Sequence, residues 1–254
     1  MVKINNLIIY ILYLLPISII SGPFLSDLSI VIIDLWILFK IFNEKGIISK
    51  YFNNKILLFF LLFNIYLIFS SAISDHLVFS LKSSFLYFRF YLFSFAIWYI
   101  FENLNFLFKY FFFSVSIAII LIIISAIFDL IYVKEFFNNI DLTSGELRRV
   151  SGLFGDELIM GSILKNLFVF FIILFCFLNY FEKKYINTLT IIFILWTISF
   201  AVLISGERTS IFIYLIYCVF AGIILRKKFS IIKVSIISIL TVTILFLTFD
   251  HLRE

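Results

Sequence analysis

The feature that most constrains this chain is a stretch of apolar residues that no charged side chain interrupts. Residues 110–128 read YFFFSVSIAIILIIISAIF, which is close to the length of about 20 residues that an α-helix needs to cross a bilayer. Across the chain, 64% of the residues are hydrophobic and only 14% are charged, whereas a soluble domain carries about 25% charged residues. The apolar stretches are long and continuous rather than alternating, which favours spanning helices over a β-barrel. We therefore predict an all-α, polytopic transmembrane helical bundle.

Nine segments are apolar enough to be predicted as spans, and short polar connectors separate them. They are residues 4–21, 25–42, 56–73, 78–101, 110–133, 157–181, 186–204, 208–225 and 230–249. No internal repeat and no Pro/Gly-rich linker divides the chain. We expect one transmembrane domain over residues 1–254.

The distribution of basic residues predicts the orientation of these spans, because Lys and Arg collect on cytoplasmic loops. With the N-terminus in the cytoplasm, twelve of the 20 basic residues fall on the inner side. They are Lys3, Lys40, Lys45, Lys50, Lys55, Lys109, Lys183, Lys184, Arg226, Lys227, Lys228 and Lys233. This orientation places residues 134–156 and 205–207 on the outer side.

Arg89 lies about halfway along the predicted span 78–101, where a charge costs about 3 kcal/mol on insertion scales. Lys82 lies seven residues earlier and therefore on the same helix face, nearer the outer surface. Two interpretations remain open. The pair belongs to a functional anion site, or Arg89 forms a structural ion pair with Asp34 while Lys82 extends to the surface.

Two more groups of basic residues belong to the outer half of the predicted bundle. Lys165 is about eight residues into the span 157–181, which is about 12 Å below its outer end. Arg148 and Arg149 precede a glycine-containing turn in an outer loop, where topology requires no positive charge. The sequence leaves open whether Lys165 lines a functional cavity, and the arginine pair has an alternative interpretation as a solvated charged loop.

The segment LISGERTSIF, residues 203–212, interrupts an otherwise apolar region. Gly206 permits a tight turn, and Arg208 then opens the predicted span 208–225. A helix N-terminus attracts anions, and a guanidinium matches the geometry of phosphate. Glu207 could instead neutralise Arg208 locally. Together, these basic residues predict a cationic pocket open to the outer leaflet, which suits a lipid diphosphate, although sulfate, carboxylate or an acidic sugar would fit the same charges.

Two sequence stretches and one buried charge resemble a known family. The stretch RVSGLFGDELIMGSIL (149–164), the SGERTS turn (205–210) and the mid-span Arg89 resemble features of bacterial O-antigen ligase and O-antigen polymerase-type membrane glycosyltransferases. The resemblance covers residues 85–225. It implies a helical C-type glycosyltransferase in lipopolysaccharide biosynthesis, which acts at the periplasmic face of the inner membrane on undecaprenyl-diphosphate-linked glycans.

The resemblance also implies roles for particular residues and partners. Arg149 and Arg208 would bind the diphosphate and Arg89 would assist, with Lys82, Arg148, Lys165 and Glu207 in support. The partners would be a lipid-linked oligosaccharide donor, a glycan or lipid A core acceptor and membrane lipids. No metal, nucleotide cofactor or nucleic acid is implied.

The sequence departs from the family pattern at the catalytic base. The family carries a histidine in a large periplasmic loop, and neither His76 nor His251 matches that context. We therefore expect this chain to be the N-terminal portion of a longer protein. Two other classes stay open: a transporter or flippase for an anionic or lipid-linked substrate, and a noncatalytic membrane subunit.

Overall fold

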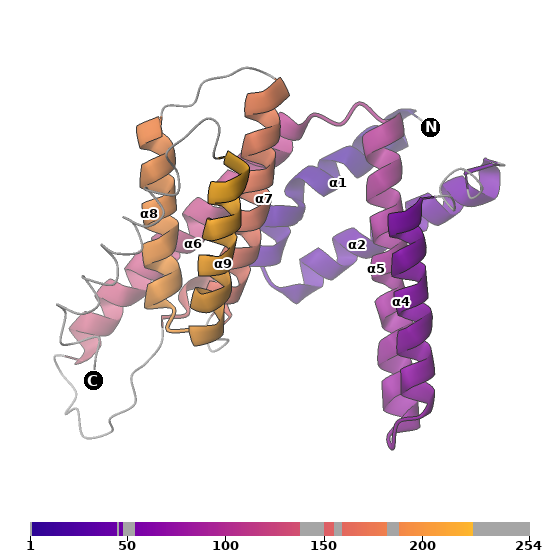
Figure 1. The fold of residues 1–254 in the computed structure, drawn as a ribbon, viewed down its shortest axis with the longest axis horizontal. Coiled ribbons are helices and arrows are strands. Elements are labelled where there is room, and N and C mark those ends of the chain that lie inside the picture. The colour runs from indigo at the N-terminus through magenta and orange to yellow at the C-terminus, as the bar shows by residue number, and fades with distance from the viewer. Residues whose placement is uncertain are drawn as a thin grey trace. The chain divides into compact units, whose positions relative to one another are not determined.

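All regular structure in the described part of the chain is helical (Figure 1). The computed structural model describes residues 2–44, 46–47, 54–137, 150–154, 159–181 and 188–225. Its elements are α1 (Val2–Ile20), α2 (Pro23–Asn43), α4 (Lys55–Ala72), α5 (Leu77–Asn103), α6 (Phe108–Phe137), the 3-10 turn η1 (Gly152–Phe154), α7 (Met160–Phe181), α8 (Thr188–Ile204) and α9 (Arg208–Leu225). Residue contacts group the chain into two compact units, Met1–Leu107 (unit 1) and Phe108–Glu254 (unit 2).

The predicted all-α class is confirmed, and a helix coincides with each of the first eight predicted segments. The segment 230–249 lies outside the described residues. Four described helices are long and apolar enough to cross a membrane: Lys55–Ala72, Leu77–Asn103, Phe108–Asp129 and Met160–Leu178. A helix suits this environment because it satisfies its backbone hydrogen bonds internally. That the remaining segments also span the membrane, to a total of nine, stays a prediction.

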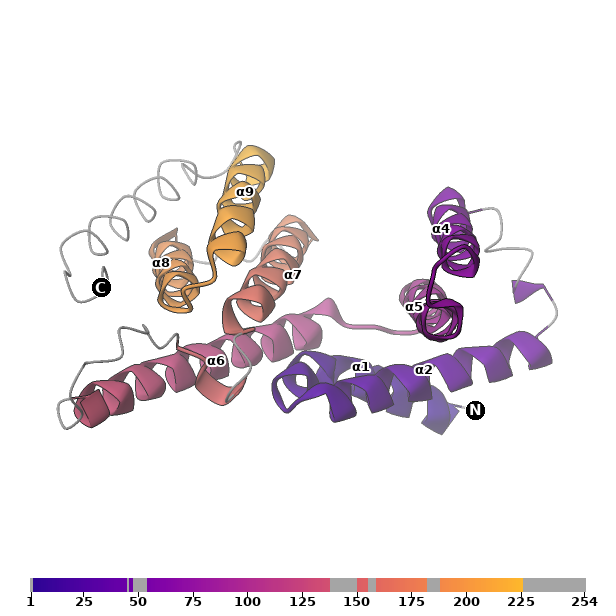
Figure 2. The ribbon, with the colours of Figure 1, turned by 90° about the horizontal axis from the view of Figure 1, so that it is seen from below.

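Unit 1 consists of the helix pairs α1–α2 and α4–α5, with α2 packed against α5. Figures 1 and 2 show α4 lying alongside α5. These two helices are antiparallel, because Ser71 near the end of α4 hydrogen-bonds Ser84 near the start of α5. In contrast, α2 and α5 run parallel. Asp27 near the start of α2 pairs with Arg89, and Trp36 further along contacts Tyr99 with 5.7 Å between ring centroids.

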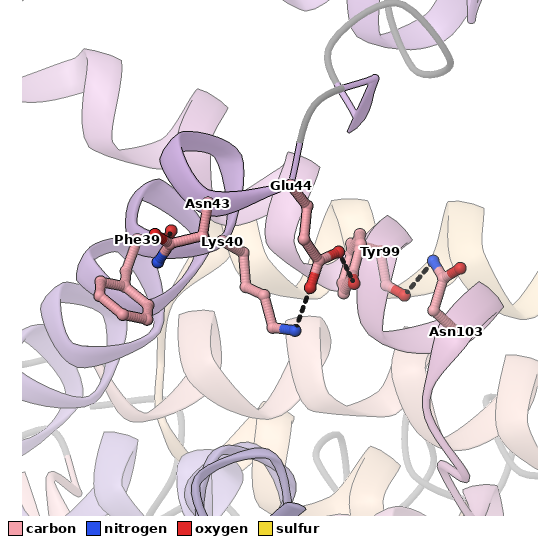
Figure 3. Close-up of polar contacts among 6 residues, drawn as sticks. All are labelled: Phe39, Lys40, Asn43, Glu44, Tyr99 and Asn103. Atoms are coloured by element: carbon pink, nitrogen blue, oxygen red, sulfur yellow. Dashed lines mark hydrogen bonds and ion pairs between the residues drawn. The ribbon is translucent and has the colours of Figure 1, made fainter. Parts of the chain in front are cut away.

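A polar cluster ties the end of α2 to α5 (Figure 3). Glu44, which follows the last residue of α2, accepts a hydrogen bond from the Lys40 ammonium and one from the Tyr99 hydroxyl at 3.2 Å. The hydrogen bond from Lys40, together with its charge, lowers the pKa of the Glu44 carboxyl despite some opposing desolvation. The ionised carboxylate is therefore the form that this cluster stabilises.

Unit 2 contains α6 to α9 and η1. Helix α7 runs antiparallel to α6, since Phe108 contacts Phe177 and Phe112 contacts Phe171, with ring centroids 4.5 Å and 5.1 Å apart. Helix α9 packs against α7 and α8. At this contact the Tyr214 ring lies 4.8 Å from that of Phe168 on α7. Its hydroxyl shares a buried 2.8 Å hydrogen bond with Ser199 on α8.

The Glu44 cluster predicts a pH-dependent contribution to the stability of unit 1. Because the pKa of Glu44 is lowered on folding, its contribution is complete above the ordinary pKa of 4.5 and is lost as the pH falls through the folded-state value. We expect the unfolding midpoint of the wild-type chain in detergent to exceed that of Glu44→Gln at neutral pH. The difference should shrink as the pH is lowered from about 7 to about 3. A difference in unfolding midpoint that stays constant over this pH range would contradict the stabilising role of the ionised Glu44 carboxylate.

Candidate functional site

The SGER segment forms a tight turn between α8 and α9, as predicted. The N–H of Ser205 donates to Ala201 O at 3.2 Å, and the N–H of Gly206 donates to Leu203 O at 3.0 Å. Gly206 has a φ of +67°, which side chains larger than hydrogen disfavour. The hydroxyl of Ser205 turns inward and donates to Val202 O at 2.7 Å. The turn thus ends α8 and places Arg208 as the first residue of α9.

The Glu207 carboxylate joins the starts of two helices. Its Oε1 accepts from the N–H of Gly161, the second residue of α7, at 2.9 Å. Its Oε2 accepts from the hydroxyl of Ser210, the third residue of α9, at 2.6 Å. A carboxylate is favourable at both positions because each helix N-terminus carries partial positive charge. The two N-termini therefore lie together at one end of unit 2.

Gly161 allows this close approach between α7 and the turn. A Cβ at this position would overlap the Ser205 hydroxyl and lie 3.2 Å from Ser205 Cβ and 3.3 Å from Glu207 Cδ. Ser205 itself is only 1% exposed. The α7 backbone can thus meet the turn only because no side chain projects there.

The segment that follows the predicted arginine pair is anchored at the same end of unit 2. Asp129 Oδ2, on α6, accepts from the N–H groups of Ser151 at 3.0 Å and Gly152 at 3.1 Å. Gly152 has a φ of +58°, and a Cβ there would lie 2.8 Å from Ser125 Oγ and 3.4 Å from Met160 Sδ. The turn η1, which begins at Gly152, packs against α6. The residues that make the contacts described in this and the preceding paragraphs are together called the turn cluster. Its members are Asp129, Ser151, Gly152, Gly161, Ser205, Glu207 and Ser210.

The start of α7 differs from the sequence prediction. The helix begins at Met160 rather than at 157, so that Lys165 is only five residues along it, or about 8 Å instead of about 12 Å. Lys165 is part-buried and lies one helical turn from Gly161 on the same face. The anchor Asp129 and the contact point Gly161 were not predicted; in the sequence each is only an isolated polar or small residue near an apolar stretch.

Some of the predicted site residues are not described in full. The backbone of Arg208 is placed, but its side chain is not among those described, and Arg148, Arg149 and His251 lie outside the described residues. His76 precedes α5 in unit 1 and its side chain forms no cap hydrogen bond. Lys82 is exposed on α5.

The ion pair with Asp34, which was one of the two interpretations of Arg89, is not found. Arg89 pairs with Asp27 rather than with Asp34, through two contacts of 3.2 Å each (Nη1–Oδ2 and Nη2–Oδ1). The guanidinium also stacks on the neighbouring Phe90 ring, with 4.8 Å between Cζ and the ring centroid. The Arg89 side chain is 31% exposed and the Asp27 side chain 48%. Arg89 therefore takes part in an ion pair between α2 and α5, and its convergence with Arg149 and Arg208 of unit 2 stays a prediction.

Comparison with known proteins assigns no family: no protein-family model, no curated protein and no solved structure matches this chain.

The close contact at Gly161 predicts that this position does not tolerate a side chain. Gly161→Ala should destabilise unit 2 by about 1–3 kcal/mol, as overpacking of a tight interface does, and lower the unfolding midpoint in detergent. Ser162→Ala, at the next position, adds no atom and serves as the control. Adding Ser205→Ala should recover part of the loss because it removes the overlapping oxygen. A stable Gly161→Ala variant would show that the contact does not limit this interface.

Proposed function

We propose that this chain is a membrane glycosyltransferase that transfers or polymerises an undecaprenyl-diphosphate-linked glycan at the periplasmic face of the bacterial inner membrane. The class is that of O-antigen ligases and polymerases, as the sequence resemblance implies. The observation that carries the proposal is the meeting of the α7 and α9 N-termini at the turn cluster, with Arg208 as the first residue of α9.

This arrangement suits a diphosphate for electrostatic reasons. The first N–H groups of a helix have no partner within the helix, and they direct partial positive charge toward the same point. Arg208 adds a full charge at that point in the sequence, and Lys165 follows one turn along α7. Two phosphate groups offer the negative charge and the acceptor oxygens that such donors require.

Residues 150–154 give Arg149 its proposed place in the site. Their anchor on Asp129 and their proximity to Met160 hold the chain beside the start of α7. Arg149 directly precedes Val150, which is buried, and consecutive Cα atoms are 3.8 Å apart. We assign Arg149 to the same diphosphate as Arg208, with Arg148 in support.

Glu207 has a structural role in this proposal. Its carboxylate bridges Gly161 and Ser210, so it holds α7 and α9 together at the turn. We assign the guanidinium of Arg208 to the substrate. When the glycosidic bond breaks, negative charge grows on the leaving diphosphate oxygen, and preorganised cations stabilise that charge more in the transition state than in the ground state.

A transporter or flippase for an anionic or lipid-linked substrate is the second candidate. Charged residues within membrane helices commonly mark a transport path, and the Asp27–Arg89 pair connects α2 with α5. The two candidates differ in where the substrate would accumulate when the protein fails. A transferase defect leaves the lipid-linked donor on the outer leaflet, and a flippase defect leaves it on the inner leaflet.

The proposal predicts that Arg208→Ala reduces surface glycan at least about tenfold, because loss of one charge-assisted hydrogen bond costs about 1.5–3 kcal/mol. The assay follows surface glycan on gels in cells whose glycan depends on this protein, and measures lipid-linked donor accessible from outside in spheroplasts. Arg226→Ala, just beyond the other end of α9, is the matched control and should leave the glycan unchanged.

Three outcomes distinguish the candidates. Donor that accumulates on the outer leaflet of the Arg208→Ala strain supports glycosyl transfer. Donor that accumulates only on the inner leaflet supports the transporter instead. Unchanged glycan in a strain that produces normal amounts of the variant overturns the assignment of Arg208.

A further inference from the structure

A second polar feature, independent of the turn cluster, lies within unit 1. Asp34 is near the middle of α2 and only 5% exposed. Both of its carboxylate oxygens are buried, and neither has a hydrogen-bond partner among the described residues. Its neighbours along the helix, Ile33 and Ile37, are apolar and fully buried.

An ionised carboxylate in this position would be costly. A buried charge without a partner loses its hydration and gains no hydrogen bond in return. A carboxylic acid without charge avoids most of that cost, and burial therefore favours the protonated form. The environment of Asp34 is that of a group that holds a proton.

Among the side chains described in α1, α2 and α5, the cations are Lys40, Lys82 and Arg89. Helix α1 contributes Tyr10 and Tyr13, and α2 itself contributes Asp27 and Lys40, of which Lys40 is bound to Glu44. Helix α5 carries Lys82, Tyr87, Arg89, Tyr91, Tyr99 and Glu102. Lys82 is exposed, and Arg89 is the cation that an ion pair with Asp27 places against α2.

Arg89 has donor capacity beyond its present pair. Its Nη1 and Nη2 contact Asp27, but its Nε is buried and has no acceptor among the described residues. Asp27 and Asp34 are seven residues apart, which is about 10 Å along one helix face. The two carboxylates therefore lie on the same face of α2, two helical turns apart.

We propose that Asp34 is a proton-binding site in α2 and that Arg89, now paired with Asp27, is the cation that takes the place of the proton when it leaves. When Asp34 is protonated, Asp27 is the one ionised carboxylate that pairs with Arg89. When Asp34 loses its proton, Asp27 and Asp34 compete for the Arg89 guanidinium. We assign a proton rather than a metal ion to this site, because no group of three or more His, Cys, Asp or Glu side chains among the described residues could hold a metal. This inference does not depend on the proposed glycosyl transfer.

The test uses dicyclohexylcarbodiimide, which modifies protonated carboxyls in apolar surroundings, on the full chain in detergent, with peptide mass spectrometry as the readout. We expect the adduct on Asp34 and not on Asp27, and no adduct on this peptide in Asp34→Asn. Asp27→Asn frees Arg89, and labelling of Asp34 should then fall at least about tenfold, since an adjacent cation favours the ionised form by that factor or more.

Controls and a second measurement keep the outcome decisive. Asp129→Asn is a control because Asp129 lies in unit 2 and its carboxylate has hydrogen-bond partners. This variant should leave the labelling of Asp34 unchanged. Infrared difference spectra of wild type against Asp34→Asn at neutral pH should contain the C=O band of one protonated carboxyl. Absence of both the adduct and this band overturns the proton site. Equal labelling of Asp34 in wild type and Asp27→Asn, with the band present, overturns the role of Arg89.

Discussion

The described part of unit 2 depends on one carboxylate that serves two helix starts. Glu207 accepts from the Gly161 backbone and the Ser210 hydroxyl, and each contact places negative charge where a helix dipole is positive. Without that charge, two parallel helices with adjacent N-termini would repel each other electrostatically. The sharp turn at Gly206 and the bare backbone at Gly161 are the steric conditions for this contact.

The same arrangement relates structure to the proposed function. Two helix N-termini that lie together form a region that attracts anions. The Glu207 carboxylate accepts from only some of the N–H groups that are free at these two helix starts. Unit 1 shows a different solution to charge in an apolar environment. There, Asp27 and Arg89 neutralise each other at 3.2 Å, while Asp34 has no hydrogen-bonding partner in the described structure and is proposed to be neutral.

Apolar stretches predicted the helices well, because the length and position of a membrane helix follow from hydrophobicity alone. Helix α9 begins at Arg208 as predicted, since the SGER segment contains its own turn signals. Side-chain pairing was less predictable. Asp27 and Asp34 lie on one face of α2, and periodicity cannot choose between them for Arg89. The start of α7 was missed because the group found at its N-terminus, Glu207, comes from a segment distant in sequence.

The central claim is that the end of unit 2 at the turn cluster binds a lipid diphosphate. The most direct measurement is a titration of the purified full chain in detergent with undecaprenyl diphosphate and, separately, with the uncharged undecaprenol. The account predicts that the diphosphate binds at least about tenfold more tightly than the alcohol, as expected for one or more charge-assisted contacts, and that Arg208→Ala abolishes this preference. Equal affinity for the two lipids would contradict it.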